Sequence, residues 1–104
     1  MREWEKNIDD DSKIRLKMIK NPYGLKWSVA YLLFAGYWVD IVRIDNYEHE
    51  GCNRPHIHRY KQKRVEFTDL SFAEAEKAAK VIGDKMKEMV KNDIYRDCER
   101  YKKN

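Results

Sequence analysis

The sequence has few of the residues that mark secreted or membrane proteins. Its two cysteines, Cys52 and Cys98, lie far apart and form no CxxC pair, so neither a disulfide framework nor a structural zinc site is expected. No run of ~20 apolar residues is present to span a bilayer, and the first residues lack the apolar stretch of a signal peptide. We therefore expect a cytoplasmic protein with reduced thiols and no membrane partner.

The length and the charge distribution indicate the number of domains and the kind of partner. A chain of 104 residues accommodates one domain with one core. The formal net charge is +4, and the segment 54–64 carries five basic residues and no acid. A basic stripe interleaved with Tyr60 and histidines is typical of a surface that binds a polyanion such as RNA. The basic residues after position 95 are interpreted as a solvated surface.

The pattern of apolar residues predicts an antiparallel sheet. Residues 1–11 are polar apart from Trp4 and Ile8, and we expect an N-terminal arm, loose or in a short helix, whose Trp4 docks on the body. A single α+β domain then occupies residues 12–104. Period-two alternation, β-branched and aromatic residues, and turn residues indicate four or five strands. These strands are expected at 12–20, 25–34, 37–44, 56–60 and 64–67.

The last third of the chain predicts one long helix. Ser71 and Glu74 have the spacing of a capping box, and Leu70 precedes them as a staple residue. An unbroken helix from 72 to 101 would be ~45 Å long, beyond the ~30 Å width of a small domain. We expect the helix to overhang, or to break near Gly83 or Asn92. The predicted fold is α+β, with a four- to five-stranded antiparallel sheet and one long C-terminal helix packed on one face.

All three histidines fall within ten positions, at 49, 56 and 58. On a strand, side chains at i and i+2 leave the same face, so His56, His58 and Tyr60 are predicted to project together, opposite Ile57. A metal centre would need a third ligand such as His49 or Asp45, and the spacing departs from that of cupins. A histidine-triad hydrolase would need a histidine where Tyr60 stands. We therefore predict neither a metal nor a cofactor, and keep a small metal-dependent enzyme as an alternative.

Cleavage of RNA without a metal fits this set of residues. One imidazole takes the proton of a ribose 2′-OH, another protonates the leaving oxygen, and a cation stabilises the charge on phosphorus. The predicted catalytic residues are His56, His58 and His49, with Asp45 orienting an imidazole, and the predicted substrate-binding residues include Arg43, Arg54, Arg59 and Tyr60. The alternative is a non-catalytic protein-binding or RNA-binding module in which backbone groups or Asp45 satisfy structural histidines.

One segment resembles a known family. Arg43-Ile44-Asp45-Asn46, a loop carrying His49, Pro55-His56-Ile57-His58, and a helix led by Ser71 are similar to the TumE-type toxins of prokaryotic toxin-antitoxin pairs, over about positions 43 to 82. The resemblance implies a small α+β toxin that acts on RNA and is neutralised by an antitoxin with a DNA-binding domain. It implies site positions at Asp45, Asn46, His49, His56 and His58.

The apolar stripe of the helix continues past the length that a small sheet covers. An uncovered stripe of this kind favours a partner, so we expect a homodimer, or an antitoxin segment in the groove. The stripe consists of Met86, Met89, Val90, Ile94, Tyr95, Cys98 and Tyr101.

Overall fold

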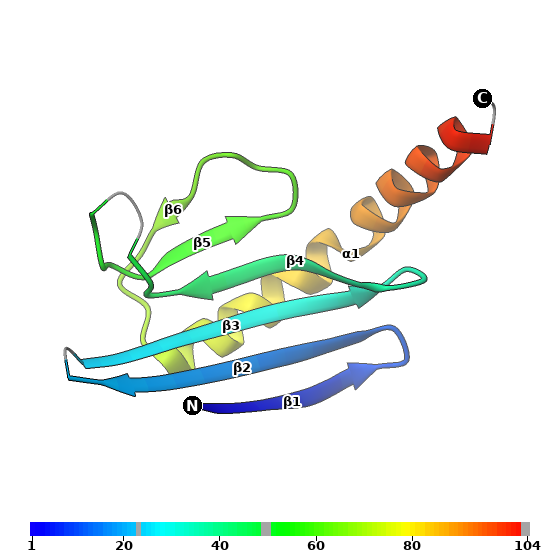
Figure 1. Cartoon of the computed structure of the whole chain (residues 1–104). Coiled ribbons are helices and arrows are strands. Elements are labelled where there is room, and N and C mark those ends of the chain that lie inside the picture. The colour runs from blue at the N-terminus through cyan, green and yellow to red at the C-terminus, as the bar shows by residue number, and fades with distance from the viewer. Residues whose placement is uncertain (23, 49–50, 103–104) are drawn as a thin grey trace.

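The computed structural model of the protein describes residues 1–22, 24–48 and 51–102, the last three by their backbone only. Six strands form one sheet in the order β1-β2-β3-β4-β5-β6, and every neighbouring pair is antiparallel. A single helix lies behind this sheet in Figure 1. The elements are β1 (Arg2–Asp9), β2 (Ser12–Asn21), β3 (Gly24–Phe34), β4 (Trp38–Asp45), β5 (His56–Arg59), β6 (Glu66–Phe67) and α1 (Phe72–Lys102).

The α+β prediction is confirmed, but the strand number and the N-terminal arm were wrong. Residues 2–9 form the edge strand β1, in which Trp4 lies opposite Leu16 of β2. Trp4 docks on the body as expected, with its ring centroid 6.1 Å from that of Phe72. The alternating pattern of β1 is obscured in the sequence by Lys6, which lies between Trp4 and Ile8 on the same face. Lys6 pairs with Glu76 of α1.

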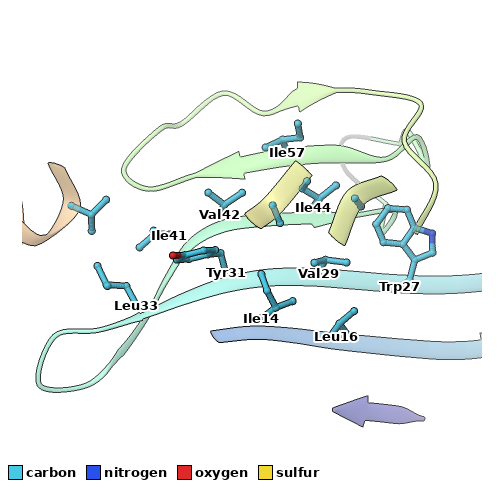
Figure 2. Close-up of a cluster of buried hydrophobic side chains, with 13 residues drawn as sticks. Ile14, Leu16, Trp27, Val29, Tyr31, Leu33, Ile41, Val42, Ile44 and Ile57 are labelled. Carbon is cyan, nitrogen blue, oxygen red and sulfur yellow. The ribbon is translucent and has the colours of Figure 1, made fainter. Parts of the chain in front are cut away.

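The core lies between the sheet and α1. Alternate residues of the central strands point toward the helix, as Figure 2 shows for Ile14, Val29 and Tyr31. The described part of the chain contains no helix with the length and apolarity needed to cross a bilayer. The buried hydrophobic cluster comprises Ile14, Leu16, Trp27, Val29, Tyr31, Leu33, Ile41, Val42, Ile44, Ile57, Ala75, Ala79 and Val90.

The helix begins where its capping residues indicate and does not break before its end. The backbone N–H of Glu74 donates to Ser71 Oγ at 3.2 Å, and that of Ser71 donates to Glu74 Oε1 at 3.0 Å, so the predicted capping box is confirmed. The helix is 31 residues long and continues without a break through Gly83 and Asn92. Its C-terminal part extends beyond the sheet (Figure 1), in a molecule 52 × 29 × 22 Å in extent. Of the two alternatives, the overhang is correct.

Ion pairs fasten the distal half of the helix to two turns of the sheet. Lys87 Nζ lies 2.8 Å from Asp9, the last residue of β1, and 2.5 Å from Asp11, in the β1–β2 turn. Lys61, after β5, lies 2.7 Å from Asp93 and 3.0 Å from Asp97 of α1. The helix is therefore held at both edges of the sheet, and the opposite face of the sheet stays uncovered by any described element.

Candidate functional site

The uncovered face of the sheet carries two rows of side chains that cross the strands. In the first row the registered partners are Arg15 on β2, Ala30 on β3, Arg43 on β4 and His58 on β5. In the second row, two residues further along each strand, they are Lys17, Ser28, Asp45 and His56. Because residues i and i+2 of a strand share a face, both rows point away from α1.

Asp45 is the centre of the site. Its side chain is 1% exposed, and four groups surround its carboxylate. Oδ1 lies 3.2 Å from His56 Nε2 and accepts a hydrogen bond of 3.0 Å from the backbone N–H of Tyr47. Oδ2 accepts a hydrogen bond of 2.9 Å from Arg43 Nε and lies 3.6 Å from His58 Nε2. A carboxylate this deeply buried requires such partners, and here they come from β4, from β5 and from the backbone just after β4.

The two histidines differ in accessibility. His56 is 2% exposed, and its Nδ1 lies 3.0 Å from the carbonyl oxygen of Arg54, so both ring nitrogens face oxygen atoms inside the protein. His58 is 28% exposed, with its ring centroid 4.7 Å from that of His56. A molecule in solvent can therefore reach His58, whereas the buried His56 contacts Asp45 and the ring of His58.

A cavity of about 290 Å³ opens beside His58. Hydrogen bonds to Asp93 and Asp97 raise the pKa of Lys61, which keeps a positive charge at its edge. Desolvation raises the pKa of Asp40 above its usual value, against the attraction of Arg43 and Arg15. The cavity thus places an accessible imidazole among cationic groups. Its lining residues are Asp40, Ile41, Arg43, His58, Arg59, Tyr60 and Lys61.

The structure brings together four of the predicted site residues: Arg43, Asp45, His56 and His58. The shared face of His56 and His58, with Ile57 in the core, is confirmed. The expectation that Tyr60 shares that face is wrong, because β5 ends at Arg59 and the Tyr60 hydroxyl donates to Asp93 of α1 at 3.0 Å.

The other predicted residues have different roles, and one lies outside the described residues. Arg59 lines the cavity while pairing with Glu66 at 2.7 Å. The exposed side chain of Arg54 pairs with Asp69, and its carbonyl oxygen lies 3.0 Å from His56 Nδ1. Asn46 fixes the start of β3, since its Oδ1 accepts from the Trp27 N–H and its Nδ2 donates to the Leu25 carbonyl. His49 is the residue that the structure does not describe.

Sequence reasoning missed the contribution of β2 and the start of β4. Arg15 and Lys17 alternate with apolar residues, a pattern that predicts the strand but also places two cations on the uncovered face. Asp40 joins that face through a bulge, where the register shifts opposite Tyr31 and Leu32. The alternation in β2 is a signal that could have found the cations, whereas the bulge has no comparable sequence signal.

The donor atoms of Asp45, His56 and His58 also suit a metal ion. All three lie within 4.8 Å of one another, and the carbonyl at Nδ1 orients His56 Nε2 toward the centre, as in many metal sites. Arg43 opposes this use, because its guanidinium occupies Asp45 Oδ2 at 2.9 Å. A divalent cation there would face a fixed positive charge.

Comparison of the chain with protein-family models, with curated proteins and with solved structures gives no match. The assignment of a function therefore rests on the geometry of the site.

Proposed function

We propose that this protein is a toxin-like ribonuclease that cleaves RNA without a metal, with His58 as the group that transfers the proton. The observation that carries the proposal is the pairing of an accessible His58 with the buried carboxylate of Asp45, next to Arg43. A carboxylate behind an imidazole orients the ring and stabilises its protonated form. His56, at 2% exposure, is a positioning residue in this scheme.

The reaction follows from these positions. The His58 ring takes the proton of a ribose 2′-OH, the 2′ oxygen forms a bond to phosphorus, and the bond from phosphorus to the 5′ oxygen breaks. The released 5′ oxygen takes a proton from water. Arg43, with a side chain 43% exposed, stabilises the negative charge that builds on the phosphoryl oxygens. The products are a 2′,3′-cyclic phosphate and a 5′-hydroxyl end.

The toxin part of the proposal is supported by the resemblance of residues 43–82 to TumE-type toxins. Three of the five positions that the resemblance implies, Asp45, His56 and His58, cluster in the site. We propose accordingly that an antitoxin with a DNA-binding domain neutralises the protein. The role that the resemblance gives to Asn46 gains no support, since both ends of its side-chain amide bond the backbone of β3.

The test is cleavage of a labelled single-stranded RNA in the presence of a chelator. The wild type is expected to release 2′,3′-cyclic phosphate ends, and His58→Ala is expected to lower the rate by ~10²-fold or more, the usual contribution of a proton-transfer group. Lys80→Ala, an exposed change on α1, is the matched control. No cleavage by the wild type, or equal cleavage by His58→Ala, would reject the proposal.

A divalent metal centre is the second candidate, favoured by the spacing of Asp45, His56 and His58. The absorption spectrum of bound Co²⁺ distinguishes the two candidates, because imidazole and carboxylate ligands give visible bands that depend on the ligand set. Cleavage that is lost in chelator and restored by zinc, nickel or manganese would make His58 a metal ligand in place of a base. Cleavage that persists in chelator supports the proton-transfer scheme.

A further inference from the structure

We infer that single-stranded RNA lies across the uncovered face of the sheet, in a groove that runs from β2 to His58 on β5. The groove consists of the two cross-strand rows described above together with Trp38 and Asp40. The inference rests on the proposed function for the reaction at one end of the groove, whereas the binding surface follows from the geometry of the sheet. It assigns substrate contacts to Lys17, Arg15 and Trp38.

The groove is deep in its middle because two small residues lie there. Ser28 and Ala30 of β3 stand between the long side chains of β2 and β4. They form part of a cavity of about 200 Å³, which shares Asp40 and Arg43 with the cavity at His58. The two cavities are therefore adjacent, with Asp40 and Arg43 between them. The first is lined by Arg15, Lys17, Ser28, Ala30, Leu32, Trp38, Asp40 and Arg43.

The charge along the groove suits a polyanion. Three cations and one carboxylate line the first cavity, and desolvation raises the pKa of that carboxylate, Asp40. The acids Glu3 and Glu5 pair with Arg15 from the edge strand β1, outside the lining of the groove. From β2 to β5 the rows span three strand spacings, or ~14 Å at ~4.8 Å each, which is long enough to contact successive phosphates.

Exposed aromatic side chains on β4 and β6, beside the groove, favour single-stranded RNA over a duplex. Trp38 is 40% exposed and Phe67 is 38% exposed, the latter opposite His56 on β6. Cations accompany both rings: Lys13 Nζ lies 4.0 Å from the centroid of the Trp38 ring, and the Arg54 guanidinium lies 5.9 Å from that of Phe67. Unpaired bases stack on aromatic side chains while basic groups follow the backbone, whereas the bases of a duplex are already stacked.

The experiment measures binding with a substrate that cannot react. A fluorescent 2′-O-methyl RNA has no free 2′-OH, so its anisotropy reports binding by the intact wild-type chain without cleavage. Lys17→Ser is expected to weaken binding and to reduce the slope of log affinity against log salt by ~0.7, one phosphate contact for single strands. Lys85→Ser removes the same charge from the exposed side of α1 and is the matched control, expected to bind as the wild type does.

Two further variants are expected to change the affinity for RNA in opposite directions. Trp38→Ala is expected to weaken binding at least ~5-fold, the smaller end of a lost base stack. Asp40→Asn removes the one carboxylate that lines the first cavity and is expected to tighten binding. Thermal unfolding of each variant shows whether it is folded. Asp40→Asn changes one exposed side chain and tests the groove even if Trp38→Ala fails to fold.

The outcomes separate this inference from the proposed function. Binding that depends on Lys17 and Asp40 without any cleavage of ordinary RNA supports the groove and rejects the ribonuclease. Cleavage that persists while Lys17→Ser, Asp40→Asn and Lys85→Ser all bind as the wild type does rejects the groove alone. Preferred binding of a duplex of the same length, or binding of an acidic peptide but not RNA, overturns the inference as well.

Discussion

Tyr31 of β3 occupies the space that a side chain at Gly83 of α1 would need. A Cβ at Gly83 would overlap the Tyr31 ring, and the Tyr31 hydroxyl donates a 2.7 Å hydrogen bond to Asp84, the next residue of the helix. Burial raises the pKa of this hydroxyl to about 12, so it remains a donor at neutral pH. The contact sets how closely the helix approaches the sheet at β3.

Gly83→Ala is expected to destabilise the protein by ~1–3 kcal/mol, the usual cost of adding atoms to a packed core. In an exposed helix the same change would stabilise by up to ~1 kcal/mol, because glycine is a poor helix former. The sign of the change in the free energy of unfolding therefore shows whether the contact with Tyr31 dominates. Urea unfolding of the wild type and Gly83→Ala gives the difference. In a Tyr31→Ala background, Gly83→Ala should become nearly neutral or stabilising, and an unchanged cost there would refute the steric explanation.

Asp9 links the β1–β2 turn to the helix and predicts a response to acid. Its hydrogen bond with Lys87 is the main cause that lowers the pKa of Asp9 well below its usual range, with Ser12 second. The stabilisation is fully present above the unfolded pKa of ~3.9 and is lost as pH falls through the lower folded value. Asp9→Asn should lower the free energy of unfolding at pH 7 and flatten its fall between pH 5 and pH 2.

The exposed neighbour Asp10 is the control for this change. Asp10→Asn removes the same charge from the same turn, and no ion pair of Asp10 occurs among the described residues. Urea unfolding at pH 7, 5, 4, 3 and 2 compares the two variants with the wild type. If both variants show the same acid dependence, the pairing of Asp9 with Lys87 is not its source.

The two histidines of the site are expected to differ in their effect on stability. His56→Ala leaves the buried Asp45 carboxylate without one partner, at a cost of ~1–3 kcal/mol. His58→Ala changes a partly exposed strand residue and is expected to stay within ~0.5 kcal/mol while abolishing cleavage and growth inhibition. Chemical unfolding of both variants measures this. A large loss for His58→Ala would favour a structural role for the histidine strand.

Local patterns predicted most of the sheet, the helix and the clustered residues on β4 and β5, because each depends on residues close in sequence. The capping box at Ser71 and the i, i+2 pair at His56 and His58 are signals of this kind. The edge strand β1 was missed because Lys6 interrupts the apolar alternation of Trp4 and Ile8. The cross-strand row that joins Arg15 to His58 depends on the register of four strands, and the position of Asp40 depends on the bulge in β4. Short-range patterns specify neither.

The overhanging part of α1 predicts self-association. Tyr95 is 73% exposed and Phe34 is 45% exposed, and both line a cavity of about 660 Å³ between the helix and the β3–β4 turn. The charges around it have both signs, with Lys91 and Glu99 in the lining. A surface of mixed charge is complementary to a copy of itself related by a two-fold axis, whereas a polyanion would require one sign.

We therefore expect a homodimer in which this surface packs on its two-fold mate. Light scattering after gel filtration should give twice the chain mass for the wild type and the chain mass for Tyr95→Asp, which places a charge in the apolar contact. Deleting residues 92–104 should have the same effect but also removes Asp93 and Asp97, the partners of Lys61, so the point variant is the cleaner test. Val81→Asp, at an exposed position outside the cavity lining, is the control and should remain dimeric. A monomeric wild type, or a dimer that Tyr95→Asp leaves intact, would show that the helix overhang is not the interface.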